Sequence, residues 1–288
     1  MVAPSTKISV IIVTYNAEHT ISNAINSVLT QTYNEIELLI IDGGSTDKTN
    51  KIISGFSNKI NYFISEKDNG IYDAMNKGIQ ASTGEWLIFI GADDIFSKNN
   101  SLEEIFCKNK FKNIDFIYGD VKLKSNNKIL GGHRDYNQLI EKNICHQAIF
   151  YNKSIFEKVG NYNLKYKILA DYDLNLRVFR NSQINTKYIS TIVSIFNDKG
   201  GASSTIIDNN FFSTQLDYFI NIEKIEPKSP LLQQYYFYVG LVNIINKDFK
   251  KGFLNVLKSF MSGKRKLYFI LIFIKIFISN SIQKTKIV

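Results

Sequence analysis

The chain has 288 residues, enough for one large domain or one domain with an appendage, and with 44% hydrophobic and 21% charged residues its composition is that of an ordinary globular protein. Its two cysteines, Cys107 and Cys145, lie far apart and without metal-ligand spacing, which argues against a disulfide framework and indicates a reducing compartment. The first residues lack the charged-then-apolar pattern of a signal peptide, so we expect a cytoplasmic protein.

The net charge of +9 is unevenly distributed along the chain. Residues 224–288 hold 12 Lys and Arg against 2 Asp and Glu, a net charge of +10, whereas residues 1–223 hold 23 against 24, a net charge of −1. Such an asymmetry indicates a polyanionic partner for the C-terminal segment, either nucleic acid or an anionic membrane.

Apolar runs alternate with helical patterns through residues 8–90. Nearly continuous apolar runs predict buried strands at 8–14, 36–41, 60–65 and 86–90. Helical spacing and capping residues predict helices over 20–30, from about 47, and over 70–81. This alternation is typical of a parallel α/β sheet. Further strands are expected at 115–123 and 186–196, and a further helix at 172–180.

Polar residues follow each of the first four predicted strands. In parallel sheets, ligands bind outside the carboxyl ends of the strands. We therefore expect these polar residues to converge on one crevice; they are Thr14, Tyr15 and Asn16, then Asp42, then residues 66–68, then Asp93 and Asp94.

Two adjacent carboxylates, Asp93 and Asp94, end the apolar run in "WLIFIGADDIF". Carboxylates are rarely buried unless they are paired or bind a cation. Mg²⁺ and Mn²⁺ favour oxygen ligands and often bridge to substrate phosphates, so the pair predicts a divalent-cation site. The alternative is a helix cap or a surface turn.

The C-terminal segment contains two apolar-basic stretches, 231–260 and 267–279, after a boundary marked by Pro227 and Pro230. The second, "LYFILIFIKIFIS", carries Lys275 and is shorter than the roughly 20 apolar residues that a spanning helix needs. We expect an interfacial helix that binds an anionic membrane. The alternatives are a helix packed in the core and a homodimer interface.

The motifs "VIIVTYNAEHTISNAINSVLTQTYNEIELLIIDGGSTDKT", "DNGIYDAMNKGIQASTGEWLIFIGADD" and "ADYDLNLR" together resemble the inverting family 2 glycosyltransferases with a GT-A fold. The match is close from Ile8 to about Asp94 and looser to about Ser204. The resemblance implies a Rossmann-like, mostly parallel α/β sheet flanked by helices over residues 1–223. The donor half is expected at about 1–120 and the acceptor half at about 121–223. Residues 224–288 would then form a helical, membrane-associating, basic and apolar extension.

The resemblance also implies a site for a sugar-nucleotide donor. Thr14, Tyr15 and Asn16 match the stretch that lines the nucleotide pocket, with Tyr15 near the base. Asp42 matches the acidic residue that accepts a hydrogen bond from the base; the alternative is that it caps the next helix. Lys67 or Lys77 would supply positive charge near the diphosphate.

Further donor-site assignments depend on the acidic residues. Asp73 would contact the donor sugar or form only local hydrogen bonds. Asp94 is the expected ligand of Mn²⁺ or Mg²⁺, and Asp93 is expected to contact the ribose or to complete the metal site. The family often has an acidic or polar residue where Ala92 stands, which puts the ribose contact in doubt.

On the acceptor side, Asp171 aligns with the catalytic aspartate of the family, which deprotonates the acceptor hydroxyl. The usual preceding Glu is Ala170 here, and Met75 stands where the family carries an Arg. His146 is expected near the acceptor, with a purely structural role as the alternative.

These observations predict a metal-dependent inverting glycosyltransferase of the hexosyl or N-acetylhexosaminyl type. It would move a sugar from a nucleoside-diphosphate sugar, UDP first, to a glycan or lipid-linked oligosaccharide in surface polysaccharide biosynthesis. It would act peripherally, at the inner face of the cell membrane. The alternatives are a catalytically impaired sugar-nucleotide-binding protein and a basic membrane-binding or nucleic-acid-binding protein. We expect no nucleic acid partner, because the basic charge is confined to an apolar segment. The G-x-G-x-x-G and P-loop motifs are absent, which argues against an oxidoreductase and an NTPase.

Overall fold

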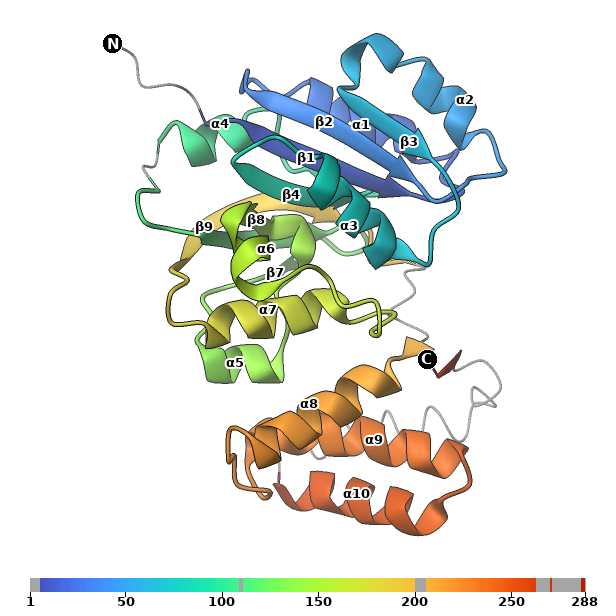
Figure 1. Cartoon of the computed structure of the whole chain (residues 1–288), viewed down its shortest axis with the longest axis vertical. Coiled ribbons are helices and arrows are strands. Elements are labelled where there is room, and N and C mark those ends of the chain that lie inside the picture. Colours follow the sequence, from blue (N-terminus) through green and yellow to red (C-terminus); the bar gives the residue numbers. More distant parts are fainter. Residues whose placement is uncertain (1–5, 109–110, 200–205, 263–269, 271–285, 288) are drawn as a thin grey trace. The chain divides into compact units, whose positions relative to one another are not determined.

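The computed structural model of the chain describes residues 6–108, 111–199, 206–262, 270 and 286–287 (Figure 1). The chain divides into two compact units, each built from segments that are not contiguous in sequence. The first unit comprises residues 1–134, 144–164 and 174–199, and the second comprises residues 135–143, 165–173 and 200–288.

The first unit is built on a nine-stranded sheet with the order β3-β2-β1-β4-β8-β6-β9-β5, in which β7 pairs with β6. Its strands are β1 (Ile8–Thr14), β2 (Ile36–Asp42), β3 (Tyr62–Ser65), β4 (Trp86–Gly91), β5 (Ile95–Phe96), β6 (Phe116–Leu123), β7 (Ile129–Leu130), β8 (Ile149–Asn152) and β9 (Thr186–Phe196). The first four strands pair in parallel, which confirms the predicted α/β sheet. β8 pairs antiparallel with both β4 and β6, so the second half of the sheet is mixed.

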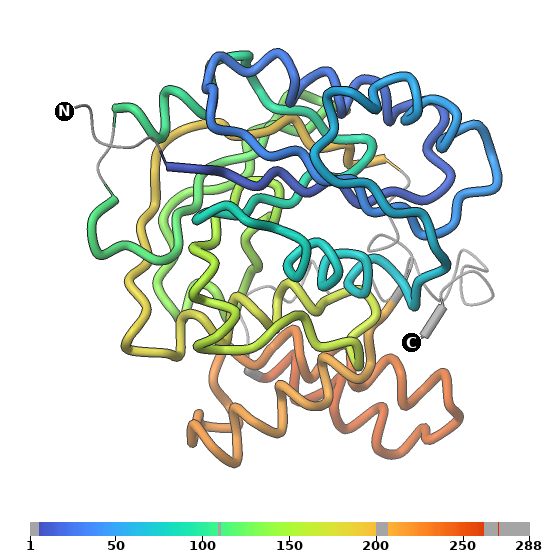
Figure 2. The backbone as a smooth tube through the Cα atoms, turned by 45° about the horizontal axis from the view of Figure 1, so that its top comes forward, coloured from blue at the N-terminus to red at the C-terminus, as the bar shows by residue number. Residues whose placement is uncertain are grey.

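Helices cover both faces of the parallel strands, as the alternating pattern predicts. The helices of the first unit are α1 (Ile21–Leu29), α2 (Thr49–Ser54), α3 (Ile71–Ala81), α4 (Ser101–Phe106) and α6 (Ser154–Val159), with the short 3₁₀ turns η1 (Ser57–Lys59) and η2 (His146–Ala148). Figure 2 traces the strand–helix alternation in the blue and teal part of the chain.

The central strand β1 is buried along its whole length, which explains why its sequence does not alternate. Val10 and Ile12 share a core cluster with Ala24 and Ile25 of α1. Ile11 points to the opposite face, where a Cβ at Gly78 of α3 would lie 2.5 Å from its Cγ2. The two faces of one strand thus fix α1 and α3 on opposite sides of the sheet.

The second unit is helical. It contains α5 (Tyr136–Glu141), α8 (Asn209–Asn221), η4 (Pro230–Leu232), α9 (Gln233–Ile245) and α10 (Phe249–Ser262), with the two-residue strands β10 (Ile206–Ile207) and β11 (Lys286–Ile287). Helix α7 (Ala170–Arg180) is shared, because its residues 170–173 belong to the second unit and its residues 174–180 to the first.

The expected boundary after residue 223 stays a prediction, and helix α8 falls in the same unit as the C-terminal helices. The physical reason is aromatic packing. The rings of Phe212 and Phe219 in α8 lie 5.8 Å and 5.0 Å from the ring of Tyr235 in α9, measured between centroids. The second unit therefore has an aromatic core of its own.

The expected interfacial helix at 267–279 lies outside the described residues, apart from Ile270. Among the helices within the described ranges, none combines the length and the apolar character that crossing a bilayer requires.

Candidate active site

The carboxyl ends of the parallel strands meet at one edge of the sheet. The register aligns Thr14 of β1 with Asp42 of β2, and Asp42 with Ser65 of β3. On the other side of β1, Val13 aligns with Gly91 at the end of β4. The polar residues that follow these strands therefore share one edge of the first unit, as the sequence predicts.

A cavity of about 520 Å³, here named the strand-end pocket, opens at this edge. Its lining residues are Val13, Thr14, Tyr15, Gly43, Gly44, Lys67, Asp68, Gly70, Ile71 and Ala74. Three of the predicted donor residues are among them: Thr14, Tyr15 and Lys67. Tyr15 is 63% exposed, so its ring presents a free aromatic face to a ligand.

The strand-end pocket combines a buried hydroxyl with two adjacent glycines. The Thr14 side-chain oxygen is buried and has no hydrogen-bond partner among the described residues. Gly44 has a φ of +81°, and a Cβ at Gly43 would lie 2.5 Å from Oδ2 of Asp68. Asp68 belongs to the 66–68 stretch that was expected at this edge of the sheet, but no donor-binding role was predicted for it.

Asp42 directly precedes the pocket-lining Gly43 and Gly44 and is only 1% exposed. Its Oδ2 accepts hydrogen bonds from the backbone of Gly44 (3.1 Å) and Ser45 (2.9 Å) and from Oγ of Ser65 (2.6 Å). In the structure Asp42 therefore holds the 43–45 turn, and it does not line the pocket. At the start of the next helix, α2, the hydrogen bond is accepted by another residue. Oδ1 of Asp47 accepts from the backbone amide of Thr49 at 2.9 Å.

Asn16 fastens the end of β1 to the same turn. The backbone amide of Asn16 donates to Oγ of Ser45 at 2.8 Å, and the side-chain Oδ1 of Asn16 accepts from the backbone amide of Thr46 at 2.9 Å. A φ of 48° at Asn16 makes this geometry possible, since Asn tolerates the left-handed region. Asn16 thus positions Tyr15 rather than lining the pocket itself.

Of the three charged residues predicted near the donor around α3, Lys67 lines the pocket, whereas Asp73 and Lys77 form local ion pairs. Lys77 forms ion pairs with Glu66 (2.7 Å) and Asp73 (3.9 Å), and the hydrogen bond to Glu66 raises the pKa of Lys77. Asp73 also accepts from the amide of Asn69 at 2.9 Å. Of the two lysines considered for the diphosphate, only Lys67 is among the pocket-lining residues.

The acidic pair sits in a tight turn after β4. The Asp94 amide donates to the Gly91 carbonyl at 3.1 Å, and the Asp94 side chain is buried, with 1% exposure. Its Oδ2 accepts from Nε2 of Gln147 (2.9 Å), and its Oδ1 accepts from the amide of Asn197 (2.8 Å). The exposed Asp93 accepts from Nδ2 of Asn197 at 2.9 Å.

Gln147 and Asn197 were missed by sequence reasoning because they lie far from the acidic pair along the chain. The only signals are that Gln147 follows His146 and that Asn197 directly follows β9. His146 begins the η2 turn, and it is among the neighbours that lower the pKa of Asp94. The structure therefore puts His146 in the electrostatic environment of the acidic pair.

The buried carboxyl of Asp94 is poorly stabilised as an anion by the protein alone. Burial raises its pKa and the neighbouring charge of Asp93 raises it further, whereas hydrogen bonds from Asn197 and Gln147 lower it. A cation beside the pair would offset both unfavourable effects.

Two carboxylates at this turn are placed so that they can both bind one divalent cation. Oδ2 of Asp94 and Oδ1 of Asp93 lie 2.7 Å and 3.0 Å from the position that a Cβ would take at Gly91, so both carboxylates converge over this glycine. Oxygen ligands suit Mg²⁺ and Mn²⁺. No cluster of three or more His, Cys, Asp or Glu with metal-binding geometry occurs within the described residues.

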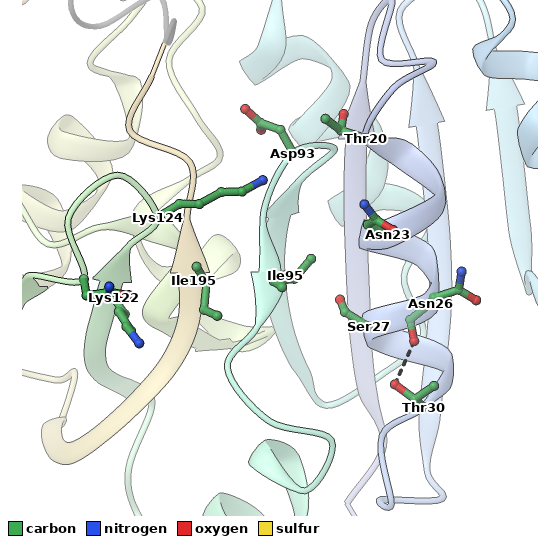
Figure 3. A pocket seen from close by; sticks show the side chains of 11 residues that line it. Thr20, Asn23, Asn26, Ser27, Thr30, Asp93, Ile95, Lys122, Lys124 and Ile195 are labelled. Carbon is green, nitrogen blue, oxygen red and sulfur yellow. Dashed lines mark hydrogen bonds between the residues drawn. The ribbon is translucent and has the colours of Figure 1, made fainter.

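Asp93 also borders a second cavity of about 570 Å³, shown in Figure 3. Polar residues of α1, among them Asn23 and Asn26, form one wall, and Lys122 and Lys124 lie on the opposite side. Asp93 is thus placed beside this cavity, and not in the lining of the strand-end pocket.

Asp171 lies in the second unit, in the first turn of α7, and is 8% exposed. Nδ2 of Asn143 donates to its Oδ2 at 3.0 Å. Asp208 holds the chain just before this helix, because its Oδ2 accepts from the amides of Ile168 (2.9 Å) and Leu169 (3.2 Å). Hydrogen bonds thus hold both the Asp171 side chain and the backbone just before it.

The comparisons with known proteins point to one family. The Glycosyl transferase family 2 model matches residues 9–181. A "PGL/p-HBAD biosynthesis glycosyltransferase" of Mycobacterium bovis is 39% identical over 208 residues, which cover 70% of this chain and 81% of the relative. The "UDP-Glc:alpha-D-GlcNAc-diphosphoundecaprenol beta-1,3-glucosyltransferase WfgD" of Escherichia coli is 29% identical over 262 residues, covering 85% and 97%. The solved structure of S. aureus TarS 1-349 in complex with UDP-GlcNAc matches with a TM-score of 0.63 at 15% identity, covering 97% of this chain and 88% of that one.

The family match covers more than half of the chain, and it includes the strand-end residues, the acidic pair and Asp171. The resemblance seen in the sequence motifs is thereby confirmed, and the TarS likeness agrees with the mostly parallel, helix-flanked sheet. The chain belongs to glycosyl transferase family 2, and it is a glycosyltransferase with a GT-A fold.

Proposed function

We propose that the protein transfers a sugar, with inversion, from a UDP-sugar to a lipid-linked or glycan acceptor with the help of a divalent cation. The observation that carries the proposal is the strand-end pocket, which shares one sheet edge with the acidic pair Asp93 and Asp94. The name of the E. coli relative supports the donor and the acceptor class, since it specifies UDP-Glc and a diphosphoundecaprenol-linked sugar.

The strand-end pocket would bind the nucleoside of the donor. The exposed ring of Tyr15 offers a surface on which a base stacks, and the unpartnered Thr14 hydroxyl offers a hydrogen bond. Asp68 offers a carboxylate acceptor for the N–H of uracil, beside Gly43. Lys67 would carry the charge that balances the diphosphate.

Asp94 and Asp93 would hold Mn²⁺ or Mg²⁺ together with phosphate oxygens of the donor. The bound cation would offset the negative charge that grows on the leaving diphosphate. Gln147 and Asn197 keep the two carboxylates in place by the hydrogen bonds described above. The raised pKa of Asp94 supports this assignment, since a cation relieves the cost of burying its charge.

Asp171 would act as the general base. Its carboxylate takes the proton of the acceptor hydroxyl, and the acceptor oxygen then bonds to the anomeric carbon from the face opposite the nucleotide. The bond between the anomeric carbon and the phosphate oxygen breaks, and the nucleoside diphosphate leaves with that electron pair. The hydrogen bond from Asn143 supports this role, because it orients the carboxylate at the start of α7.

The test is calorimetric titration of UDP, dTDP and GDP into the protein, each with Mn²⁺ and with EDTA, followed by turnover assays of Asp171→Asn. We expect metal-dependent binding that is tightest for UDP. Asp171→Asn should bind UDP normally but lose at least about a hundredfold in turnover, since general base catalysis contributes about that much.

Two other outcomes would change the conclusion. A folded protein that binds none of the three nucleotides would favour the catalytically impaired alternative. Unchanged turnover of Asp171→Asn would remove this residue from the role of base, whatever the nucleotide result.

A further inference from the structure

Helix α10 exposes a continuous line of large apolar side chains. Phe249, Phe253, Leu257 and Met261 are spaced four residues apart, so they lie along one side of the helix, and Leu254 widens the line. Their exposures are 63%, 68%, 42%, 66% and, for Leu254, 51%. We name these five residues the α10 stripe. Exposed apolar surface of this extent marks an interaction site.

The α10 stripe is not the face that packs within the second unit. That face carries Gly252 and Val256, which lie against Gly240 and Ile244 of α9. A Cβ at Gly252 would lie 2.5 Å from Cγ1 of Ile244 and 2.9 Å from the carbonyl oxygen of Gly240, so the two helices meet at their glycines. In the second unit α9 lies between α8 and α10 (Figure 1), which leaves the far side of α10 to the stripe.

Positive charge accompanies the stripe. Helix α10 contains Lys250, Lys251 and Lys258, all exposed, and no acidic residue. Asp248, directly before the helix, forms an exposed ion pair with Lys251 at 3.5 Å. Lysines beside exposed Phe and Leu side chains are typical of helices that lie in the interface of an anionic bilayer.

We propose that the α10 stripe is the surface by which this protein docks on an anionic lipid bilayer, with α10 lying parallel to the membrane plane. The 14 residues of α10 span about 21 Å, which is too short to cross the hydrocarbon core of roughly 30 Å. A lipid-linked acceptor would be met at that surface. The inference rests on the proposed function only for this last step, because docking itself requires no nucleotide.

A second copy of the chain fits the stripe less well than a bilayer. In a two-fold symmetric dimer the same surface is used by both copies, so two sets of helix lysines would face each other. Helix α10 has no acidic residue to pair with them. Anionic lipid headgroups supply this missing negative charge, and the acyl region accepts the Phe, Leu and Met side chains.

The test is co-sedimentation of the full chain with vesicles of phosphatidylcholine alone or mixed with phosphatidylglycerol. We expect binding to the mixed vesicles that weakens as salt is added. Phe253→Ser combined with Leu257→Ser should weaken it at least about tenfold, because two apolar side chains no longer enter the bilayer. Ile222→Ser is the matched control, since Ile222 is 63% exposed at the end of α8 but lies outside the stripe.

Two checks keep the result unambiguous. Circular dichroism and UDP titration of the stripe variant show whether it folds. If it does not fold, Lys250→Glu combined with Lys251→Glu gives a second test, and it should also weaken binding to the anionic vesicles. UDP binding without vesicle binding would overturn this inference alone, and vesicle binding without UDP binding would overturn the proposed function alone.

Three further results would overturn the inference. Undiminished vesicle binding of the folded stripe variant would put the contact elsewhere in the chain. Equal binding to neutral and anionic vesicles would remove the role of the lysines. A change from dimer to monomer in the stripe variant, with vesicle binding intact, would make the stripe a protein interface.

Discussion

Two glycines allow the nucleotide pocket and the acidic pair to be tested separately. An alanine Cβ at Gly43 would lie 2.5 Å from Oδ2 of Asp68, and one at Gly91 would lie 2.7 Å from Oδ2 of Asp94. Each must displace the end of a carboxylate side chain. Gly43→Ala should weaken UDP binding with and without Mn²⁺, whereas Gly91→Ala should mainly abolish the Mn²⁺-dependent part; titration calorimetry measures both. Gly55→Ala is the control, because its Cβ would meet only the Ile52 carbonyl at 3.2 Å.

Equal losses for Gly43→Ala and Gly91→Ala, in both metal conditions, would contradict this separation.

The site residues themselves were only partly predictable. Asp93 and Asp94 are visible in sequence because they interrupt an apolar run, which is a local signal. Gln147 and Asn197 are not, because the hydrogen bonds that make them part of the site join segments distant in sequence. That Thr14 and Tyr15 line the pocket was predictable. That Asp42 accepts hydrogen bonds from its own turn was not.

At the scale of elements, Asp208 connects the start of α7 with the start of α8. Its Oδ2 accepts from the amides of Ile168 and Leu169, and its Oδ1 accepts from the amide of Phe211. Asp208→Ala should destabilise the fold by about 1–3 kcal/mol, since buried donors lose their acceptor. Because Asp208 positions Asp171, the Asp208→Ala substitution should lower kcat with little change in the KM for the donor.

The control for this prediction is Asp217→Ala, which removes an exposed carboxylate of α8 that accepts a hydrogen bond from Nδ2 of Asn221. Loss of donor affinity equal to the loss of kcat in Asp208→Ala would contradict a positioning role.

The elements themselves were largely predicted: β1 and α1 match the expected ranges within one residue. The short strands β5 and β7 were not, because two residues carry no periodic signal and are fixed by their neighbours in the sheet.

At the scale of the whole molecule, the two units can be followed by different probes. The single tryptophan, Trp86, is buried in the first unit, at 2% exposure, so its fluorescence reports the sheet. Far-UV circular dichroism also reports the helices of the second unit. The basic excess of the chain lies after residue 223, so added salt should affect vesicle binding more than the stability reported by Trp86.

Acid stability of the sheet should depend on Glu37 of β2. Burial raises the pKa of Glu37, but hydrogen bonds from Ser9 and Thr83 and the charge of Lys7 outweigh it and lower this pKa to about 2. Because the folded pKa lies below the ordinary 4.5, ionised Glu37 stabilises the fold above pH 4.5, and this contribution is lost as the pH falls toward 2. Glu37→Gln should therefore destabilise the fold by about 1–3 kcal/mol at neutral pH, because its donors lose a charged acceptor, and by progressively less in acid. Urea unfolding followed by Trp86 fluorescence from neutral pH to pH 3 measures the difference, with the exposed Glu35→Gln as control. A constant difference between wild type and Glu37→Gln across this range would mean that the hydrogen bonds stabilise both protonation states equally.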